Sequence, residues 1–564
     1  MGGTLDKVVR RLHDFFQNFV SILERLLRLP SRFRSQPLEK QHSFSKRRRQ
    51  RRSLDEFATE IHQLFTGHLT TKNLMGMADQ IRTQLSTCAK TNPYCMLPSF
   101  NHTLPTGHEQ GTFLALDVGG STFRVALVQL SGQKEAMKII RMTSSPIDEE
   151  VKALQGKAFF DWMAYKIGEM LDRGTEGYGM NSEPLPMGLS WSFPIDQTSI
   201  RSGKVIKMGK GFLCSEGTVG DDLSELIMEA CRKRNVNVSI KAIVNDSSAT
   251  LLSRAYADPS TRMSLILGTG TNVAIHFPIH AIGEKKFGIR SPEWFAQASH
   301  VIVNTELSMF GGGVLPLTRW DDDLNRNHIK PDYQPLEYMI TGRYLGEILR
   351  LIIVDAVQTA GLFGGQLPSS MQNQYSFDTA IVSCIEGDTS SSFQISTTFI
   401  QKHHEFPVPP TVADMRFLQK VSKDISKRAA AYLSTAIYGL WCLKNKTEAV
   451  ILPSSPGSEQ DDSEPLKINT MKDKDLASQQ VAIACDGSVI NKYPNFRDHC
   501  QDYLNQLTSN DESQRPLSPA VSDSATLPTS LISLDPASES GIFGAAVAVA
   551  ISTPEDEIPP SAGN

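Results

Sequence analysis

The chain has 564 residues, of which 40% are hydrophobic and 21% charged, and its formal net charge is −4. This composition is that of an ordinary folded protein long enough for two or more lobes, and we do not expect nucleic acid as its main partner. No apolar stretch reaches the ~20 residues that a membrane-spanning helix needs. The eight cysteines are scattered and form no Cys-x-x-Cys pair, which argues against a zinc site.

The first 52 residues differ in charge from the rest of the chain. They carry 14 Lys and Arg against four acidic residues, a net charge of +10, so the remainder carries −14. Apolar residues recur at three- and four-residue steps from Leu5 to Leu27, which predicts an amphipathic helix that ends at Pro30. A dense basic run follows at 46–52. We predict that residues 1–52 form a targeting or docking arm.

Several partners are compatible with this arm. The helix fits a membrane surface with anionic headgroups or a groove on another protein, and it could equally dock on its own body. The basic run is typical of a nuclear import signal, a headgroup or nucleic-acid contact, or a solvated linker. We expect a cytoplasmic protein, for which the mitochondrial surface is a candidate docking place and the nucleus is the alternative location.

A helical pattern begins at Leu54 and leads to an apolar run at 113–116, which predicts a buried strand. The sequence Asp-Val-Gly-Gly-Ser-Thr-Phe-Arg follows at 117–124. Glycines let backbone N–H groups approach a phosphate closely, and consecutive N–H groups form an anion-binding concavity. A second strand runs into Gly-Thr-Gly-Thr-Asn at 268–272. One such turn is common, but two of them suggest two lobes that close on a nucleotide.

Other polar motifs lie between and beyond these turns. Asn245-Asp246 closes the apolar run Ala242–Val244, where a carboxylate can face a cleft, although an Asp here also suits a helix N-terminus. Downstream come Asn304-Thr305-Glu306, Glu337 and Asp486-Gly487-Ser488. Two inserts rich in Ser, Pro, Asp and Glu, at 453–475 and 509–528, are predicted to be disordered loops.

In their order and spacing these motifs resemble the hexokinase family, fungal type, from about Ser53 to about Ser552. The resemblance implies a two-lobed α/β body of the actin-like ATPase (ribonuclease-H-like) fold with a hinged cleft. We expect a small lobe at 111–245, a large lobe at 246–540 with a helical segment at 53–110 packed on it, and a C-terminal helix and polar tail at 541–564 that return to the small lobe.

The resemblance also implies a reaction, the transfer of the ATP γ-phosphate to the C6 hydroxyl of a hexose with Mg²⁺. Asp246 matches the general base, and Lys210 belongs to the catalytic set. The positions matching sugar contacts are Ser192, Lys210, Asn245, Asp246, Asn272, Glu306 and Glu337. Those matching nucleotide and phosphate contacts are Asp117, Gly119, Gly120, Ser121, Thr122, Arg124, Gly268, Thr269, Gly270, Thr271, Asp486, Gly487, Ser488 and Gly541. Asp117 could hold Mg²⁺ through water.

Four departures from the family pattern surround this set. Gly209 replaces a Thr that hydrogen-bonds the sugar, and Ala249 replaces a Gly after the base. Beyond Glu306, the stretch from Leu307 to Gly313 departs from the family pattern: Ser308 and Met309 replace smaller residues and two acids are lost. Ile542 replaces a Gly near the nucleotide side. Because phosphoryl transfer depends on positioning, these changes leave an alternative open. In that alternative the chain is a weak or inactive hexokinase-like sensor of sugar or nucleotide with a regulatory role.

Overall fold

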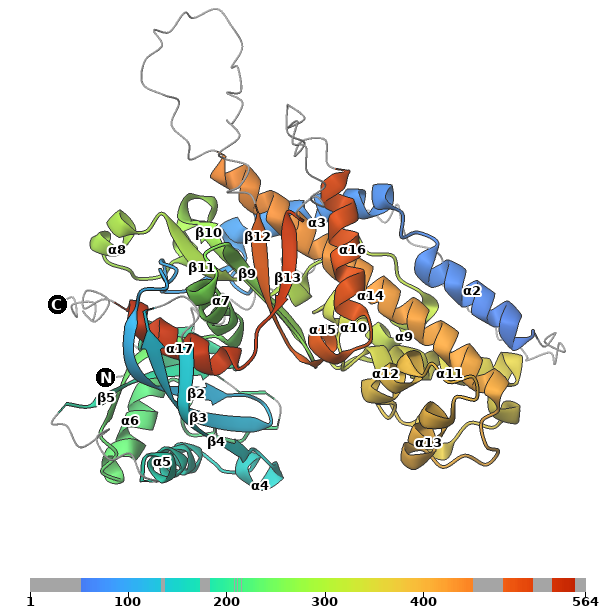
Figure 1. The fold of residues 1–564 in the computed structure, drawn as a ribbon, viewed down its shortest axis with the longest axis horizontal. Helices are drawn as coiled ribbons and strands as arrows, with labels where there is room; N and C mark the ends of the chain where they lie inside the picture. Colours follow the sequence, from blue (N-terminus) through green and yellow to red (C-terminus); the bar gives the residue numbers. More distant parts are fainter. Residues whose placement is uncertain are drawn as a thin grey trace, which may run out of the picture. The chain divides into compact units, whose positions relative to one another are not determined.

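The computed structural model describes residues 52–132, 137–172, 183–206, 208–209, 211–214, 216–449, 480–510 and 530–552. Two large β-sheets organise this part of the chain (Figure 1). The predicted arm at 1–52 lies outside the described residues except for Arg52. The predicted insert at 453–475 lies outside them entirely. In the second predicted insert, Ser509 is the last residue of a helix, and residues 511–528 lie outside the described residues.

The first sheet has five strands in the order β4-β3-β2-β5-β8. Strand β2 pairs antiparallel with β3, which pairs antiparallel with β4, while β5 runs parallel to β2 and β8 parallel to β5. The strands span β2 Gln110–Val118, β3 Thr122–Ser131, β4 Met137–Pro146, β5 Leu185–Trp191 and β8 Val238–Val244.

The second sheet repeats this plan. Its order is β1-β11-β10-β9-β12-β13, in which β9 to β11 form antiparallel pairs and β12 and β13 run parallel to β9. The strands are β1 Leu97–Pro98, β9 Thr261–Leu267, β10 Thr271–Pro278, β11 His300–Asn304, β12 Val481–Asp486 and β13 Ile532–Pro536. The two predicted phosphate turns, β2–β3 and β9–β10, therefore occupy equivalent positions in two similar sheets.

Two helices lie between the sheets, α7 Asp246–Ala257 and α17 Ser540–Ile551 (Figure 1). Helix α17 packs on strands of the first sheet, α7 packs on strands of the second, and the helices pack on each other. Their apolar side chains share one buried cluster with residues of both sheets, for example Ala115 of β2 and Ala274 of β10. The sequence of α17 is apolar on every side, as expected of a helix that is covered all round.

Glycines make the close packing of α17 possible. A Cβ added to Gly544 would lie 2.0 Å from the carbonyl oxygen of Ala249 in α7, and one added to Gly188 of β5 would lie 2.1 Å from the carbonyl oxygen of Ala545. Backbone therefore touches backbone on both sides of the helix. This seating fixes where the N-terminus of α17 lies.

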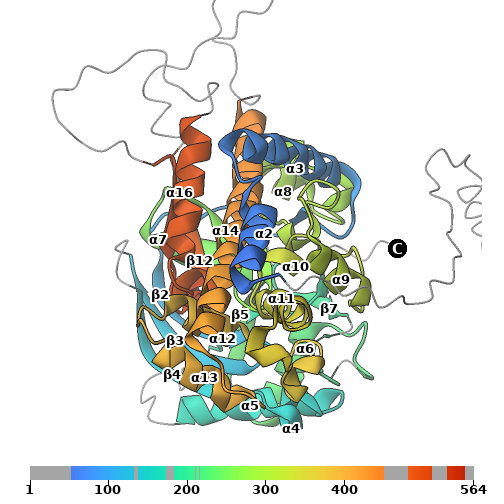
Figure 2. The same cartoon turned by 90° about the vertical axis from the view of Figure 1, so that its right-hand side faces the viewer.

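The other helices cover the outer faces. Helices α5 Lys157–Asp172 and α6 Leu223–Lys233 share a core with the first sheet. The 37-residue helix α14 spans Val412–Glu448. It packs against α2 Leu54–Thr66, α3 Thr71–Thr91 and α16 Phe496–Ser509, which Figure 2 shows around it. No helix in the described ranges is long and apolar enough to cross a membrane. The other α-helices of the described residues are α4 Glu149–Lys152, α8 Pro292–Gln297, α9 Arg319–Asn327, α10 Glu337–Ile340, α11 Leu345–Ala360, α12 Thr379–Gly387, α13 Gln394–His403 and α15 Ser488–Lys492.

The seating of α17 gives a stability prediction. Gly544→Ala should lower the thermal unfolding midpoint, because the new methyl meets the backbone of Ala249 and overpacking of this kind costs ~1–3 kcal/mol. Gly76→Ala is the matched control. It lies exposed in α3 with open space at its Cβ position, so the same change should raise stability by ~0.5–1 kcal/mol. Equal effects of both changes on the circular dichroism melting curve would contradict this packing.

Candidate functional site

The first glycine turn joins β2 to β3. The N–H of Gly119 donates to the carbonyl of Thr122 at 3.0 Å, and the carbonyl of Ser121 accepts from the N–H of Ile147 at 2.9 Å. Asp117 and Arg124 face each other across the two strands, with Arg124 Nε 3.4 Å from Asp117 Oδ2. Burial raises the pKa of the Asp117 carboxyl to about 6, although the charge of Arg124 opposes the rise.

The second turn, Gly268–Gly270, is held on several sides. The N–H of Gly342 donates to the carbonyl of Gly268 at 2.8 Å. The N–H of Arg343 donates to the carbonyl of Thr269 at 3.3 Å. The carboxylate of Glu337 accepts the N–H of Thr271 at 3.1 Å. Glu337, a predicted sugar contact, thus lies directly against the second phosphate turn.

The segment Asp486–Ser488 also adjoins this turn. Gly487 has a backbone φ of 118°, and a Cβ there would lie only 2.3 Å from the carbonyl oxygen of Leu267. Asp486 Oδ1 accepts the N–H of Gly487 at 2.6 Å. A residue other than glycine would push this segment away from the turn.

The N-terminus of α17 brings the two turns into one site. A Cβ added to Gly541 would lie 2.7 Å from the carboxylate of Asp117, next to the first turn. The Ser540 hydroxyl donates to the carboxylate of Asp486, next to the second turn, and lies 2.9 Å from the hydroxyl of Thr250. The predicted nucleotide residues of both sheets therefore meet around the first turn of this helix.

The predicted base lies at the end of β8. Asn245 caps α7 by accepting the N–H of Ser247 at 2.9 Å, and Asp246 is the first residue of the helix. Burial raises the pKa of Glu306, and the nearby charge of Asp246 adds to the rise. Asp246 also contributes to the raised pKa of Asp117. Its carboxylate is therefore electrostatically coupled to both the predicted sugar site and the first phosphate turn.

A chain of amide and hydroxyl groups connects the predicted sugar contacts. The side-chain amide of Asn304 donates to Glu306 at 2.9 Å, and its carbonyl accepts from Asn272 at 2.7 Å. Asn272 also reaches Ser247 at 3.4 Å, whose hydroxyl donates to Asn245. Asn304 was not among the predicted contacts. The Asn-Thr-Glu motif was its signal, and the structure shows that it bridges two of them.

Ser192 and the described neighbours of Lys210 lie beside the first sheet. The N–H of Ser192 donates to the carbonyl of Val118 at 3.2 Å, so this residue lies beside the end of β2. Lys210 lies outside the described residues. On either side of it Met208 and Phe212 are buried, and the ring centroid of Phe212 lies 4.8 Å from that of Phe193.

The carboxylates near α17 bear on the predicted Mg²⁺ site. Asp246 and Asp486 both help to raise the pKa of Asp117, so the three acids are close enough to interact. Among the described residues, no three His, Cys, Asp or Glu side chains are arranged to hold a metal directly. An ion held through water and phosphate oxygens, as is usual for Mg²⁺, needs no such set.

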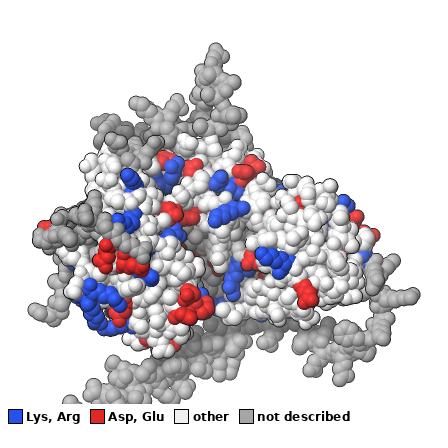
Figure 3. Space-filling model, turned by 60° about the horizontal axis from the view of Figure 1, so that its bottom comes forward, with Lys and Arg blue, Asp and Glu red and all other residues white. Residues whose placement is uncertain are grey.

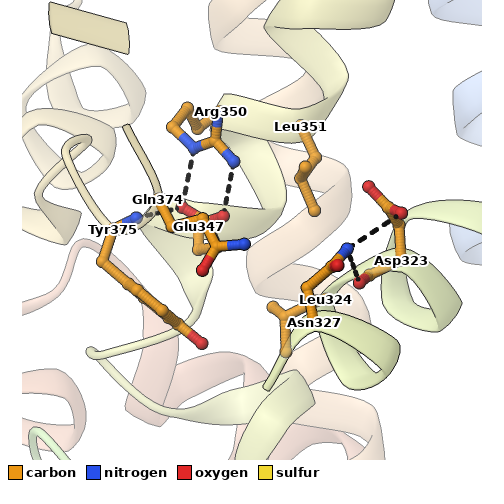
Figure 4. Close-up of a pocket in the computed structure, with 8 residues that line it drawn as sticks. All are labelled: Asp323, Leu324, Asn327, Glu347, Arg350, Leu351, Gln374 and Tyr375. Atoms are coloured by element: carbon orange, nitrogen blue, oxygen red, sulfur yellow. Dashed lines mark hydrogen bonds and ion pairs between the residues drawn. The ribbon is translucent and has the colours of Figure 1, made fainter. Parts of the chain in front are cut away.

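A small polar pocket lies away from these residues, between α9 and α11 (Figure 4). Within it, the buried pair Glu347 and Arg350 is joined by two hydrogen bonds of 2.6 and 2.8 Å, and Glu347 accepts the N–H of Tyr375. The guanidinium of Arg343 stacks on Tyr375. Glu347 therefore holds Tyr375, and Tyr375 packs against Arg343, whose N–H binds the second turn. Its lining residues are Asp323, Leu324, Asn327, Glu347, Arg350, Leu351, Gln374 and Tyr375.

Three of the positions that depart from the family pattern are buried in the core of this structure. Leu307 is fully buried in the core of the second sheet, and Ile542 is fully buried with α7 and both sheets. Ala249 is also buried, and the close approach expected at this position is provided by Gly544 on the facing helix. These substitutions change packing around the site while the polar residues stay together.

Comparisons with known proteins identify the family. Two hexokinase family models match this chain, one over residues 57–256 and the other over residues 262–551. The chain belongs to the hexokinase family. It is 29% identical to Hexokinase-5 of Oryza sativa subsp. japonica over 81% of this chain and 85% of that protein. It is also 29% identical to the hexokinase of Kluyveromyces lactis, over 73% and 77%.

A solved structure confirms the fold. The hexokinase from Schistosoma mansoni complexed with glucose is 25% identical, with a TM-score of 0.67 over 88% of this chain and 98% of that one. The predicted two-lobed hexokinase fold is therefore confirmed, as is the predicted class of enzyme, an ATP-dependent phosphotransferase that acts on a sugar hydroxyl. The alternative of an inactive sensor is not favoured. The similar proteins include plant as well as fungal hexokinases.

The remaining departure, at Gly209, can be reversed. A Cβ on Gly209 would meet no described atom within 4 Å, and its φ lies outside the left-handed region, so a side chain fits. If position 209 lies beside the sugar, as the resemblance implies, Gly209→Thr would restore a hydroxyl there, and one such hydrogen bond contributes ~0.5–1.5 kcal/mol. We expect KM for glucose to fall by about two- to tenfold. Gly209→Val has the same shape without the hydroxyl, and an equal gain from it would contradict this role.

Proposed function

We propose that this protein transfers the γ-phosphate of ATP to the C6 hydroxyl of a glucose-like hexose, with Asp246 as the general base. The observation that carries the proposal is the convergence of two groups of residues. The polar chain from Asn245 to Glu306 lies in the same body as the two phosphate turns. Asp246 begins α7, one turn before the contact of Thr250 with Ser540 of α17. The similar Schistosoma mansoni enzyme was solved with glucose, which favours glucose as the hexose.

The sugar would be oriented by groups that accept and donate paired hydrogen bonds. Glu306 and Asn272 are held in place by Asn304, so their geometry is set before a sugar arrives. Asn245 is held by Ser247 beside the base. A hexose hydroxyl is a poor nucleophile, and Asp246 would accept its proton as the bond to phosphorus forms. Ser192 and Lys210 would complete the sugar site from the first sheet.

The nucleotide would be bound by the two glycine turns and the start of α17. The N–H groups of Gly119, Gly268 and Thr271 hold the turns in shape. The backbone N–H groups of Gly120–Ser121 and Thr269–Gly270, with the guanidinium of Arg124, suit an anionic polyphosphate. Asp486–Ser488 and Gly541 would contribute from the second sheet and from α17. The carboxylate of Asp117 would hold Mg²⁺ through water, and that ion supplies neutralising charge when it is bound.

The two sheets would form the two lobes. We propose a small lobe at 111–245 with α17, and a large lobe at 246–540 with the segment 53–110. Figure 3 shows a furrow on one face, with Lys, Arg, Asp and Glu side chains of both signs along its rims. Closure of the lobes on the sugar would exclude water, so that phosphate passes to the sugar and not to water.

The arm at 1–52 would determine where the enzyme acts. Its predicted amphipathic helix and basic run suit a membrane surface or a docking partner, with nuclear import as the alternative. We propose a cytoplasmic enzyme that the arm directs to such a surface.

Replacing the base tests the proposal. Asp246→Asn should lower kcat for glucose 6-phosphate formation by ~10²–10⁴-fold, because the sugar hydroxyl loses its proton acceptor. Glucose binding, measured by calorimetry, should remain within a few-fold of wild type. The control is Asp322→Asn on the exposed face of α9, which should leave both unchanged. Full turnover by the Asp246 variant would show that another group accepts the proton.

A further inference from the structure

Glu539 has an unusual backbone conformation at the start of α17. Its φ and ψ are 49° and 32°, in the left-handed region, and it is the N-cap residue of the helix. A residue other than glycine is strained in this region and is kept there only when the surroundings fix it. The side chain of Glu539 makes no capping hydrogen bond to the helix.

The side chain of Glu539 contacts Arg124 in β3, three residues beyond the first phosphate turn. Its Oε2 accepts a hydrogen bond from the NH1 group of Arg124 at 2.6 Å, although the two residues are 415 positions apart. On its Nε side the same guanidinium faces Asp117 Oδ2 at 3.4 Å. Arg124 is thus held between two carboxylates, one from β2 and one from the start of α17.

The contact between Glu539 and Arg124 orients the guanidinium of Arg124 and contributes little to the stability of the fold. Both members of the pair remain about one-third exposed, at 34% and 37%, and ion pairs of that exposure stabilise proteins only weakly. A guanidinium is planar, with five N–H donors in a fixed arrangement. Carboxylates at Nε and NH1 fix that plane, and the remaining donors then have a defined direction.

The neighbours of Glu539 place this contact among the nucleotide residues. Ser540 binds Asp486 and Gly541 adjoins the carboxylate of Asp117. Three consecutive residues therefore contact the first turn, the segment beside the second turn and the acid predicted to hold Mg²⁺. A change in the direction of Arg124 would act where the phosphates are expected.

We propose that Glu539 is a positioning residue for the nucleotide. It holds the guanidinium of Arg124 so that the remaining N–H donors bind a phosphate oxygen of ATP. This inference rests on the proposed function and extends it to a residue that no family motif singled out in the sequence.

A double-mutant cycle tests the proposal, with steady-state kinetics of the full-length protein. Glu539→Ala should raise KM for MgATP about tenfold and change KM for glucose less than twofold. Glu539→Gln keeps an acceptor oxygen and should raise KM for MgATP only about threefold. In the Arg124→Ala background, Glu539→Ala should change KM for MgATP less than twofold, because the group through which it acts is gone. The control is Glu229→Ala, whose ion pairs with Lys157 and Lys233 lie on α5 and α6, and it should have no effect.

Two results would overturn the proposal. If Glu539→Ala raises KM for MgATP equally with and without Arg124, the glutamate does not act through that arginine. If Glu539→Ala lowers KM for MgATP, Glu539 competes with phosphate for Arg124 and does not position it. The same cycle measured on the dissociation constant of MgADP by calorimetry separates the two claims. An enzyme without turnover would refute the proposed function, while this binding cycle would still decide the role of Glu539.

Discussion

The close seating of α17 is the constraint on which the site depends. Gly188 and Gly544 let the helix backbone touch β5 on one side and α7 on the other, so the helix has little freedom to shift. Its N-terminus then meets Asp117 through Gly541 and Asp486 through Ser540. The positive end of a helix dipole is a favourable place for these carboxylates and for the phosphates they accompany.

The repeated plan of the two sheets explains why two glycine turns occur. In each sheet the turn follows the first strand of an antiparallel pair whose other side carries parallel strands. Each turn therefore lies at the same position in its own sheet. Helices α7 and α17 pack between the two sheets, and the start of α17 contacts residues beside both turns. Asp246 begins one of the joining helices, which places the predicted base at the same junction.

The sequence predicted those parts of the site that lie within one short segment of the chain. A buried strand followed by glycines predicted both turns, and an Asn-Asp pair after an apolar run predicted the end of β8 and the start of α7. Contacts between distant segments were not predictable. The pairing of Arg124 with Glu539, the bridging role of Asn304 and the burial of Ile542 all depend on how the two sheets come together. Lys210 and the arm lie outside the described residues, so their roles stay predictions.

The most direct test is the fate of phosphate when the full-length protein is given MgATP with and without glucose. If the two turns and Asp246 form one hexokinase site, ADP and glucose 6-phosphate should form in equal amounts, and ATP should be consumed very slowly without sugar. Release of inorganic phosphate at the same rate with and without glucose would contradict the account. So would the absence of any sugar phosphate at saturating concentrations of both substrates.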